Sequence, residues 1–166
     1  MPATPGLPLM HQPRRRDRRP SRRVPPKPAP LPPYRLPAAG ADVVLVGFFS
    51  ARQRDFETVM ASAAAQLTAH GARVVTRIVQ RRGVSDGGAR NMSLPYSSRT
   101  LLSHGKVREV AHAADRDGVG AVVFTTPLTE RRQRALTGLL GRPAVSLAGL
   151  LRSAQSPASG GGRRRG

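Results

Sequence analysis

The chain has 166 residues, no cysteine, and 28 basic against 9 acidic side chains, which give a formal net charge of +19. The lack of cysteine excludes a disulfide framework and a thiolate zinc site, and no apolar run reaches the roughly 18 residues that a membrane-spanning helix needs. So large a positive charge favours polyanions, RNA or DNA above all, as partners, and we expect a cytoplasmic protein without a membrane partner.

Three segments differ in composition. Residues 1–40 hold 12 of the 16 prolines and a net charge of +8, which predicts a disordered, basic arm. Residues 41–152 predict one folded domain, and residues 153–166 predict a flexible tail rich in glycine and arginine. The arm is interpreted either as a nucleic-acid-binding segment or as a solvated leader without a function. Only two of the basic residues are lysines, so high-GC coding sequence is a second explanation of the charge.

The predicted domain begins with a strand. Residues 43–49 are apolar without a break, which is typical of a strand buried on both faces of a sheet. Apolar residues at helical spacing then predict a helix over residues 55–69. A second strand over residues 72–80 alternates with one less buried face, which indicates the edge of the sheet.

Residues 81–100 show no periodicity and contain many turn-forming residues, so we predict a long loop there. Its arginines accompany one aromatic residue, Tyr96, and this combination suits contacts with an RNA backbone and stacking on bases. The alternative is an insertion without a function. The candidate RNA-binding side chains of this segment are Arg81, Arg82, Arg90 and Arg99.

A helix that ends near Gly118 follows, with Ser103 as its predicted cap. We expect the backbone N–H groups of Gly105 and Lys106 to face solvent at its start, where they can meet phosphates. A strand over residues 121–124, a helix from Thr129 to Gly141, a strand over residues 143–147 and one helical turn over residues 148–152 complete the pattern. The predicted buried positions of the helix before Gly141 are Ala135, Leu136, Leu139 and Leu140.

The order β-α-β-α-β-α-β predicts an α/β fold with a small four-stranded parallel sheet and the strand order 2-1-3-4. In such a sheet, ligands bind beyond the C-terminal ends of the central strands. This crevice is a second candidate site, suited to a nucleotide or a small phosphorylated ligand. Its predicted residues are Ser50, Arg52, Arg54, Thr125 and Thr126.

Sequence motifs for catalysis do not occur. A P-loop needs a glycine five residues before Gly105 and a serine or threonine after Lys106, but Thr100 and Val107 stand there. Neither a dinucleotide fingerprint nor a hydrolase nucleophile elbow is present, and the four histidines lack the spacing of metal ligands. We therefore predict no enzyme, no catalytic residue, no metal site and no cofactor.

Several stretches together carry a resemblance. They are Val43–Gly47, Arg77–Arg82 (similar to R-x-x-Q-R-R), Gly105–Val110 (similar to G-x-G-K-x-x-E-[LI]), and Val122–Phe124 with the helix that carries Gln133, Arg134 and Leu136. Through them, residues 43–150 resemble the N-terminal domain of the HflX family of ribosome-associated GTPases. The chain departs from the pattern at Ser103, where the family has glycine, and in its longer connection between residues 82 and 101. The helical hairpin and the GTPase domain of the family do not follow.

In that family, the GTPase domain hydrolyses GTP, and the N-terminal part engages the large ribosomal subunit near its peptidyl transferase centre to split or rescue ribosomes. The resemblance implies contact with ribosomal RNA through Arg81, Arg82 and the helix start at Gly105 and Lys106, without GTP hydrolysis, and a separate GTPase as a further partner. Our leading hypothesis is a non-enzymatic RNA-binding domain that associates with the large ribosomal subunit or modulates it. The alternatives are a ligand-binding module at the crevice and the remnant of a truncated GTPase.

Overall fold

The computed structural model describes residues 26–36, 40–84 and 88–155. The predicted disorder of the arm before residue 26 and the predicted flexibility of the tail after residue 155 fall outside these ranges, so both stay predictions.

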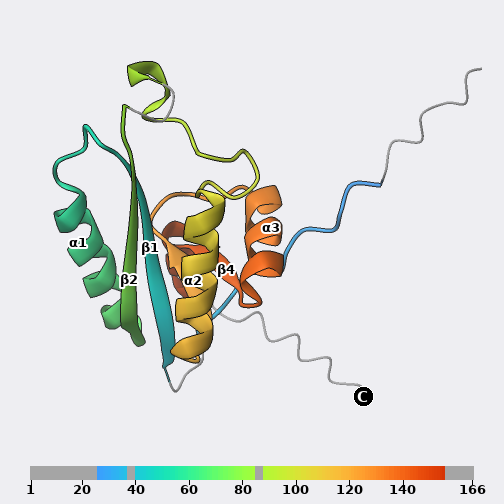
Figure 1. The fold of residues 1–166 in the computed structure, drawn as a ribbon. Coiled ribbons are helices and arrows are strands. Elements are labelled where there is room, and N and C mark those ends of the chain that lie inside the picture. The colour runs from blue at the N-terminus through green and yellow to red at the C-terminus, as the bar shows by residue number, and fades with distance from the viewer. Residues whose placement is uncertain (1–25, 37–39, 85–87, 156–166) are drawn as a thin grey trace, which may run out of the picture.

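Within the described ranges, the strands form one parallel sheet in the order β2-β1-β3-β4 (Figure 1). The strands are β1 (Ala41–Ser50), β2 (Ala72–Arg82), β3 (Ala121–Phe124) and β4 (Ala144–Ser146). The helices are α1 (Phe56–Ala69), α2 (His104–Arg116), α3 (Glu130–Leu140) and α4 (Leu147–Gln155), with a short 3-10 turn, η1 (Ala89–Asn91). This arrangement confirms the predicted α/β fold and the predicted strand order.

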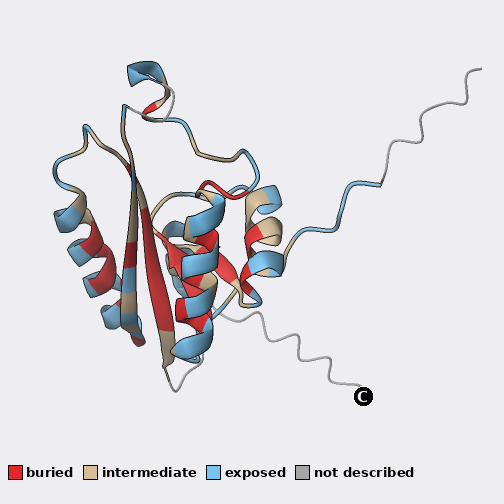
Figure 2. Ribbon diagram, viewed as in Figure 1, coloured by how far each residue is buried: buried red, intermediate tan, exposed pale blue. Residues whose placement is uncertain are grey.

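The sheet separates two apolar cores. Val44 and Val46 of β1 pack toward α2 and α3, whereas Val43 and Leu45 pack toward α1 and α4. All four side chains are fully buried, and β1 runs as a buried strand through the centre of the molecule (Figure 2). Each such burial contributes about 1.5–3 kcal/mol relative to exposure. The strand predicted to be covered on both faces is therefore the centre of the fold.

The predicted ends of two helices are confirmed. The side-chain oxygen of Ser103 accepts the N–H of Lys106 at 3.3 Å, and that of Thr129 accepts the N–H of Arg132 at 3.3 Å. Each bond satisfies a backbone donor that has no partner inside its helix. Gly141 ends α3 with a φ of 64°, a left-handed conformation that glycine adopts without strain.

The predictions for the last two helices are confirmed in part: Leu136 and Leu140 are buried, and Ala135 is half-buried. The predicted burial of Leu139 is wrong: this side chain is 52% exposed, because Leu136 and Leu140, one helical turn apart, already fill the space between α3 and the sheet. The helical turn predicted for residues 148–152 is confirmed as part of the nine-residue helix α4, whose last three residues fall in the segment predicted as a flexible tail. Leu150 of this helix is buried in the core beside α1 and holds the helix against the sheet.

Residues 26–36 contain neither helix nor strand, but they contact the domain. Tyr34 and Leu36 pack against the core between the sheet, α1 and α4. The Tyr34 hydroxyl donates to the carbonyl oxygen of Gly120 at 3.5 Å, and burial raises the pKa of this phenol above its usual 10.0. The proline-rich segment before residue 41 therefore packs against the domain through its large apolar side chains, Tyr34 and Leu36.

Candidate nucleic-acid interface

Arg81 is exposed, but its guanidinium is bonded to the protein itself. Its guanidinium donates to the carbonyl oxygen of Ala51 at 2.7 Å and, at 3.4 Å, to that of Gln53. The same group lies over the ring of Phe56, 4.5 Å from its centroid. Arg81 thus joins the end of β2 to the connection between β1 and α1.

Arg82 anchors the long connection between β2 and α2. Its Nη1 atom donates to the carbonyl oxygens of Leu94 and Pro95, at 2.8 and 2.6 Å. Its guanidinium lies 4.7 Å from the centroid of the Tyr96 ring, and that ring forms a T-shaped pair with Phe48. The predicted pairing of arginine and aromatic therefore exists, but it is an internal contact that shapes the loop.

Apolar side chains also fix this connection. Met92, Leu101 and Leu102 are at most 5% exposed, and Thr100 donates its hydroxyl to the carbonyl oxygen of Leu102 at 2.9 Å. Leu101 has a φ of 69°, an unusual backbone conformation for a large side chain, which the surrounding core stabilises. The segment next to α2 is therefore packed into the core that α2 and α3 share.

The start of α2 is bound to the end of β2. The N–H of Ser103 donates to Oε1 of Gln80 at 3.0 Å, and Nε2 of Gln80 donates back to Oγ of Ser103 at 2.8 Å. The same Oγ accepts the N–H of Lys106, so the expectation that this N–H faces solvent is wrong. The Lys106 ammonium pairs with Glu109 at 2.7 Å, and Gly105 is exposed with open space around it.

The other two arginines predicted for this site lie apart from Arg81 and Arg82. Arg90 is exposed on η1. Arg99 is exposed and lines an open hollow of about 830 Å³ beside the first turns of α3. We call this the basic hollow, and its charged lining residues among the described part of the chain are Lys27, Arg99, Glu130, Arg131 and Arg134.

The basic hollow joins three distant parts of the sequence. Arg132 of α3 donates its Nε–H to the carbonyl oxygen of Ser98 at 3.1 Å, which fixes the segment that carries Arg99. Arg134 donates to the carbonyl oxygen of Ala29 and lies 3.6 Å from Glu130, so α3 also holds the segment that carries Lys27. Figure 1 shows that the loop before α2 passes over the upper ends of α2 and α3.

Sequence reasoning missed the contribution of α3 to this site. Lys27, Arg131 and Arg134 were not predicted as binding residues, although Arg131 and Arg134 stand close together in a region with one acid, Glu130. Arginines three residues apart lie on one side of a helix, and this signal alone could have indicated a basic helix face. Their approach to Arg99 depends on the tertiary fold.

The predicted crevice residues fall into two groups. Phe124 pairs with Val46, so continuing the register places Thr125 beside Gly47, whereas Ser50 pairs with Arg82 of β2. Three residues of β1, about 10 Å, separate the two positions. Arg52 and Arg54 are exposed after the strand, and the N–H of Arg52 donates to Oγ of Ser50 at 3.3 Å.

The threonines on the other side of the crevice offer few donors. Thr125 donates its N–H to the carbonyl oxygen of Val46 at 2.9 Å, and its hydroxyl oxygen is enclosed, without a hydrogen bond to the described protein. Thr126 is half-buried. The long β1 and the short β3 end at different heights, so the serine and the threonines do not converge on one point.

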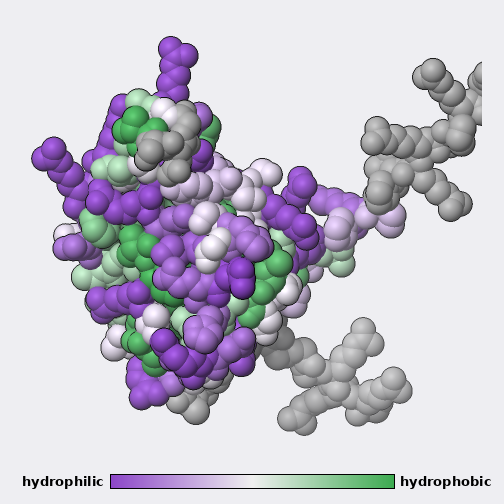
Figure 3. Space-filling model, in the orientation of Figure 1, coloured by the Kyte–Doolittle hydropathy of each residue, from purple (hydrophilic) through white to green (hydrophobic). Residues whose placement is uncertain are grey.

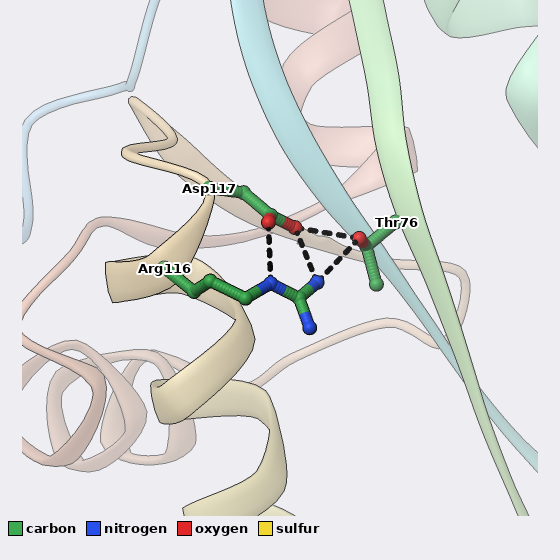
Figure 4. Close-up of polar contacts among 3 residues, drawn as sticks. All are labelled: Thr76, Arg116 and Asp117. Atoms are coloured by element: carbon green, nitrogen blue, oxygen red, sulfur yellow. Dashed lines mark hydrogen bonds and ion pairs between the residues drawn. The ribbon is translucent and has the colours of Figure 1, made fainter.

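The opposite end of α2 carries a polar cluster of its own (Figure 4). Arg116 donates two hydrogen bonds to the carboxylate of Asp117, at 2.7 and 3.0 Å, and the Thr76 hydroxyl donates a third at 2.6 Å. These bonds, first from Arg116 and then from Thr76, lower the pKa of Asp117 from 3.8 to about 2. The cluster joins α2 to the edge strand β2, so we interpret it as a structural link.

Two negative findings concern the described residues. None of their helices has the length and the apolar character needed to cross a membrane. In the same ranges, no three histidine or acidic side chains come together in a way that could hold a metal ion.

Comparison with known proteins leaves the family open. No protein-family model matches the chain, and no curated protein matches it in sequence. Kinship with the HflX N-terminal domain therefore stays a prediction that rests on the quoted motifs.

Proposed function

We propose that this chain is a non-enzymatic RNA-binding domain that associates with ribosomal RNA of the large ribosomal subunit. The observation that carries the proposal is the basic hollow, where four cationic side chains and a single acid line one opening of about 830 Å³. Cations gathered in this way bind RNA by releasing the counterions condensed on its phosphates. The net charge of +19 adds a long-range attraction to the same partner.

The resemblance to HflX supports the ribosome as the site of action. Gln80, in one of the motifs that carry this resemblance, exchanges two hydrogen bonds with Ser103, the residue that caps α2 two positions before the motif Gly105–Val110. The end of β2 and the start of α2 thus form one structural unit. In this proposal the unit positions the connection that carries Arg99, and the exposed arginines supply the affinity.

The test measures binding of the full chain to large ribosomal subunits and to single-stranded RNA over a series of salt concentrations. We expect association at low salt and a linear fall of log K with log salt, with a slope of about −0.7 for each phosphate neutralised on a single strand. Arg131→Ala removes one charge of the basic hollow and should reduce the slope by about 0.7.

Arg77→Ala is the matched control. It removes the same charge from an exposed position on β2, outside the lining of the basic hollow, and should leave the slope nearly unchanged. Absence of association at low salt would contradict the proposal, and so would equal losses in the two variants. If RNA does not bind but nucleotides raise the midpoint of thermal unfolding, the crevice hypothesis replaces ours, since a ligand at 100 times its Kd stabilises by about 2.7 kcal/mol.

A further inference from the structure

An apolar cavity adjoins the basic hollow. It encloses about 500 Å³ between the loop before α2, α2 itself and α3, within the range of about 300–1,000 Å³ that small-molecule sites occupy. We call it the base cavity, and its apolar lining residues are Leu102, Val107, Ala111 and Leu139. Leu139 is 52% exposed, so apolar surface at the cavity reaches solvent.

The base cavity and the basic hollow share a side chain. Arg99 lines both, and the bond between Arg132 and the carbonyl oxygen of Ser98 holds the intervening segment against α3. His104 and Arg108 of α2 add further basic groups to the cavity lining. An apolar recess thus stands next to a cationic one, with Arg99 between them. On the face that carries α2 and α3, hydrophilic surface predominates and hydrophobic surface occupies smaller areas (Figure 3).

We infer that the base cavity receives one unpaired base of single-stranded RNA while the basic hollow binds the adjoining phosphates. This inference rests on the proposed function and names the form of RNA that the site selects. A base is apolar on its faces and is joined through one sugar to an anionic phosphate, which matches an apolar recess beside a cationic one. In a duplex the bases are stacked and paired, so only a single strand can turn a base outward into a cavity.

The experiment compares three fluorescein-labelled probes of equal length by anisotropy with the full chain: a single-stranded oligouridylate, the same ribose-phosphate chain without bases, and an RNA duplex. The binding free energy that one base gains in the cavity should make the Kd of the oligouridylate about tenfold lower than that of the abasic chain. Leu139→Asp places a carboxylate at the base cavity and should abolish this preference. Arg99→Ala should weaken the binding of both single strands.

Leu94→Asp is the matched control, because Leu94 is 51% exposed, lies outside the lining of the base cavity, and gives the same change of charge. It should keep the tenfold preference, and circular dichroism checks that both variants are folded. Equal binding of the oligouridylate and the abasic chain by the wild type would overturn the inference and leave the proposed function standing, whereas failure of all three probes at low salt would remove both. Tighter binding of an acidic peptide with a phenylalanine than of any RNA would overturn the inference in favour of a protein partner.

Discussion

Gly47 lies inside β1, where a side chain has no room. A Cβ atom at this position would stand 2.4 Å from Cε2 of Phe49 and 2.6 Å from Sδ of Met60. Phe49 and Met60 are at most 5% exposed, so the surrounding core would have to shift. Glycine at this position is therefore required by packing between the sheet and α1.

We expect Gly47→Ala to lower the free energy of unfolding by about 1–3 kcal/mol, the usual range for overfilling a packed core. Gly138→Ala serves as the comparison, because its Cβ would meet nothing within 4 Å on the exposed side of α3. That change should raise the free energy by up to about 1 kcal/mol through helix propensity. Denaturant unfolding measures both, and destabilisation of equal size in the two variants would disprove the packing argument.

Asp117 should make stability depend on pH in the acid range. Its pKa in the folded protein is about 2, below the usual 3.8, so the folded state favours the ionised carboxylate. The stabilisation is fully present above the unfolded pKa and disappears as the pH falls through the folded pKa, that is, from about 4 to about 2.

Unfolding curves recorded across this pH range test the assignment. Asp117→Asn should flatten the acid loss of stability, and Thr76→Val, which removes one of the three hydrogen bonds to the carboxylate, should reduce it in part. Asp42, whose pKa its bonds to Arg73 also lower, should contribute to the pH dependence that remains. An unchanged slope in Asp117→Asn would show that the cluster does not hold the carboxylate in its charged form.

At the scale of structural elements, one side chain makes several contacts with the connection between β2 and α2. Arg82 bonds two carbonyl oxygens of this connection and stacks on Tyr96. Lysine keeps the charge but loses the planar group that makes these contacts together. The position of the loop, and with it the position of Arg99, should therefore depend on Arg82.

We expect Arg82→Lys to speed amide hydrogen exchange at Tyr96, whose N–H bonds the carbonyl oxygen of Leu101 at 3.0 Å, by about tenfold or more, since bonds to charged groups contribute about 1.5–3 kcal/mol. Arg90→Lys, an exposed change on η1, is the control and should leave exchange at Tyr96 unchanged. If both variants exchange like the wild type, other contacts position the loop.

For the molecule as a whole, periodicity predicted more of the fold than of the site. The unbroken apolar run of β1 and the alternation of strands and helices were sufficient to predict the parallel sheet and its order. The exposure of Leu139 and the length of α4 depend on which neighbours fill the space around them, and a linear pattern does not contain that information. Lys27 and Arg131 line the same hollow only because the tertiary fold brings them together, since more than a hundred residues separate them in the sequence.

The predicted arginines illustrate a second limit. Composition identified Arg81, Arg82 and Arg99 alike, because each carries the same charge in the same region of the sequence. The structure separates them: two guanidinium groups bind carbonyl oxygens of the protein itself, and the third lines an open surface. A guanidinium can serve a fold or a partner equally well, so the distinction requires coordinates.

The edge strand β2 has one further consequence. Arg77 and Arg81 are both exposed and four residues apart, so they lie on one face of the strand. Arg73 lies on the other face, because the bulge at Val75 shifts the register between them. A second copy that added its own β2 to this border would set guanidinium against guanidinium, and like charges opposite each other disfavour strand pairing. Repulsion between the arginines of two copies thus disfavours aggregation through the exposed edge of β2. A bound polyanion that neutralises these arginines also removes this protection.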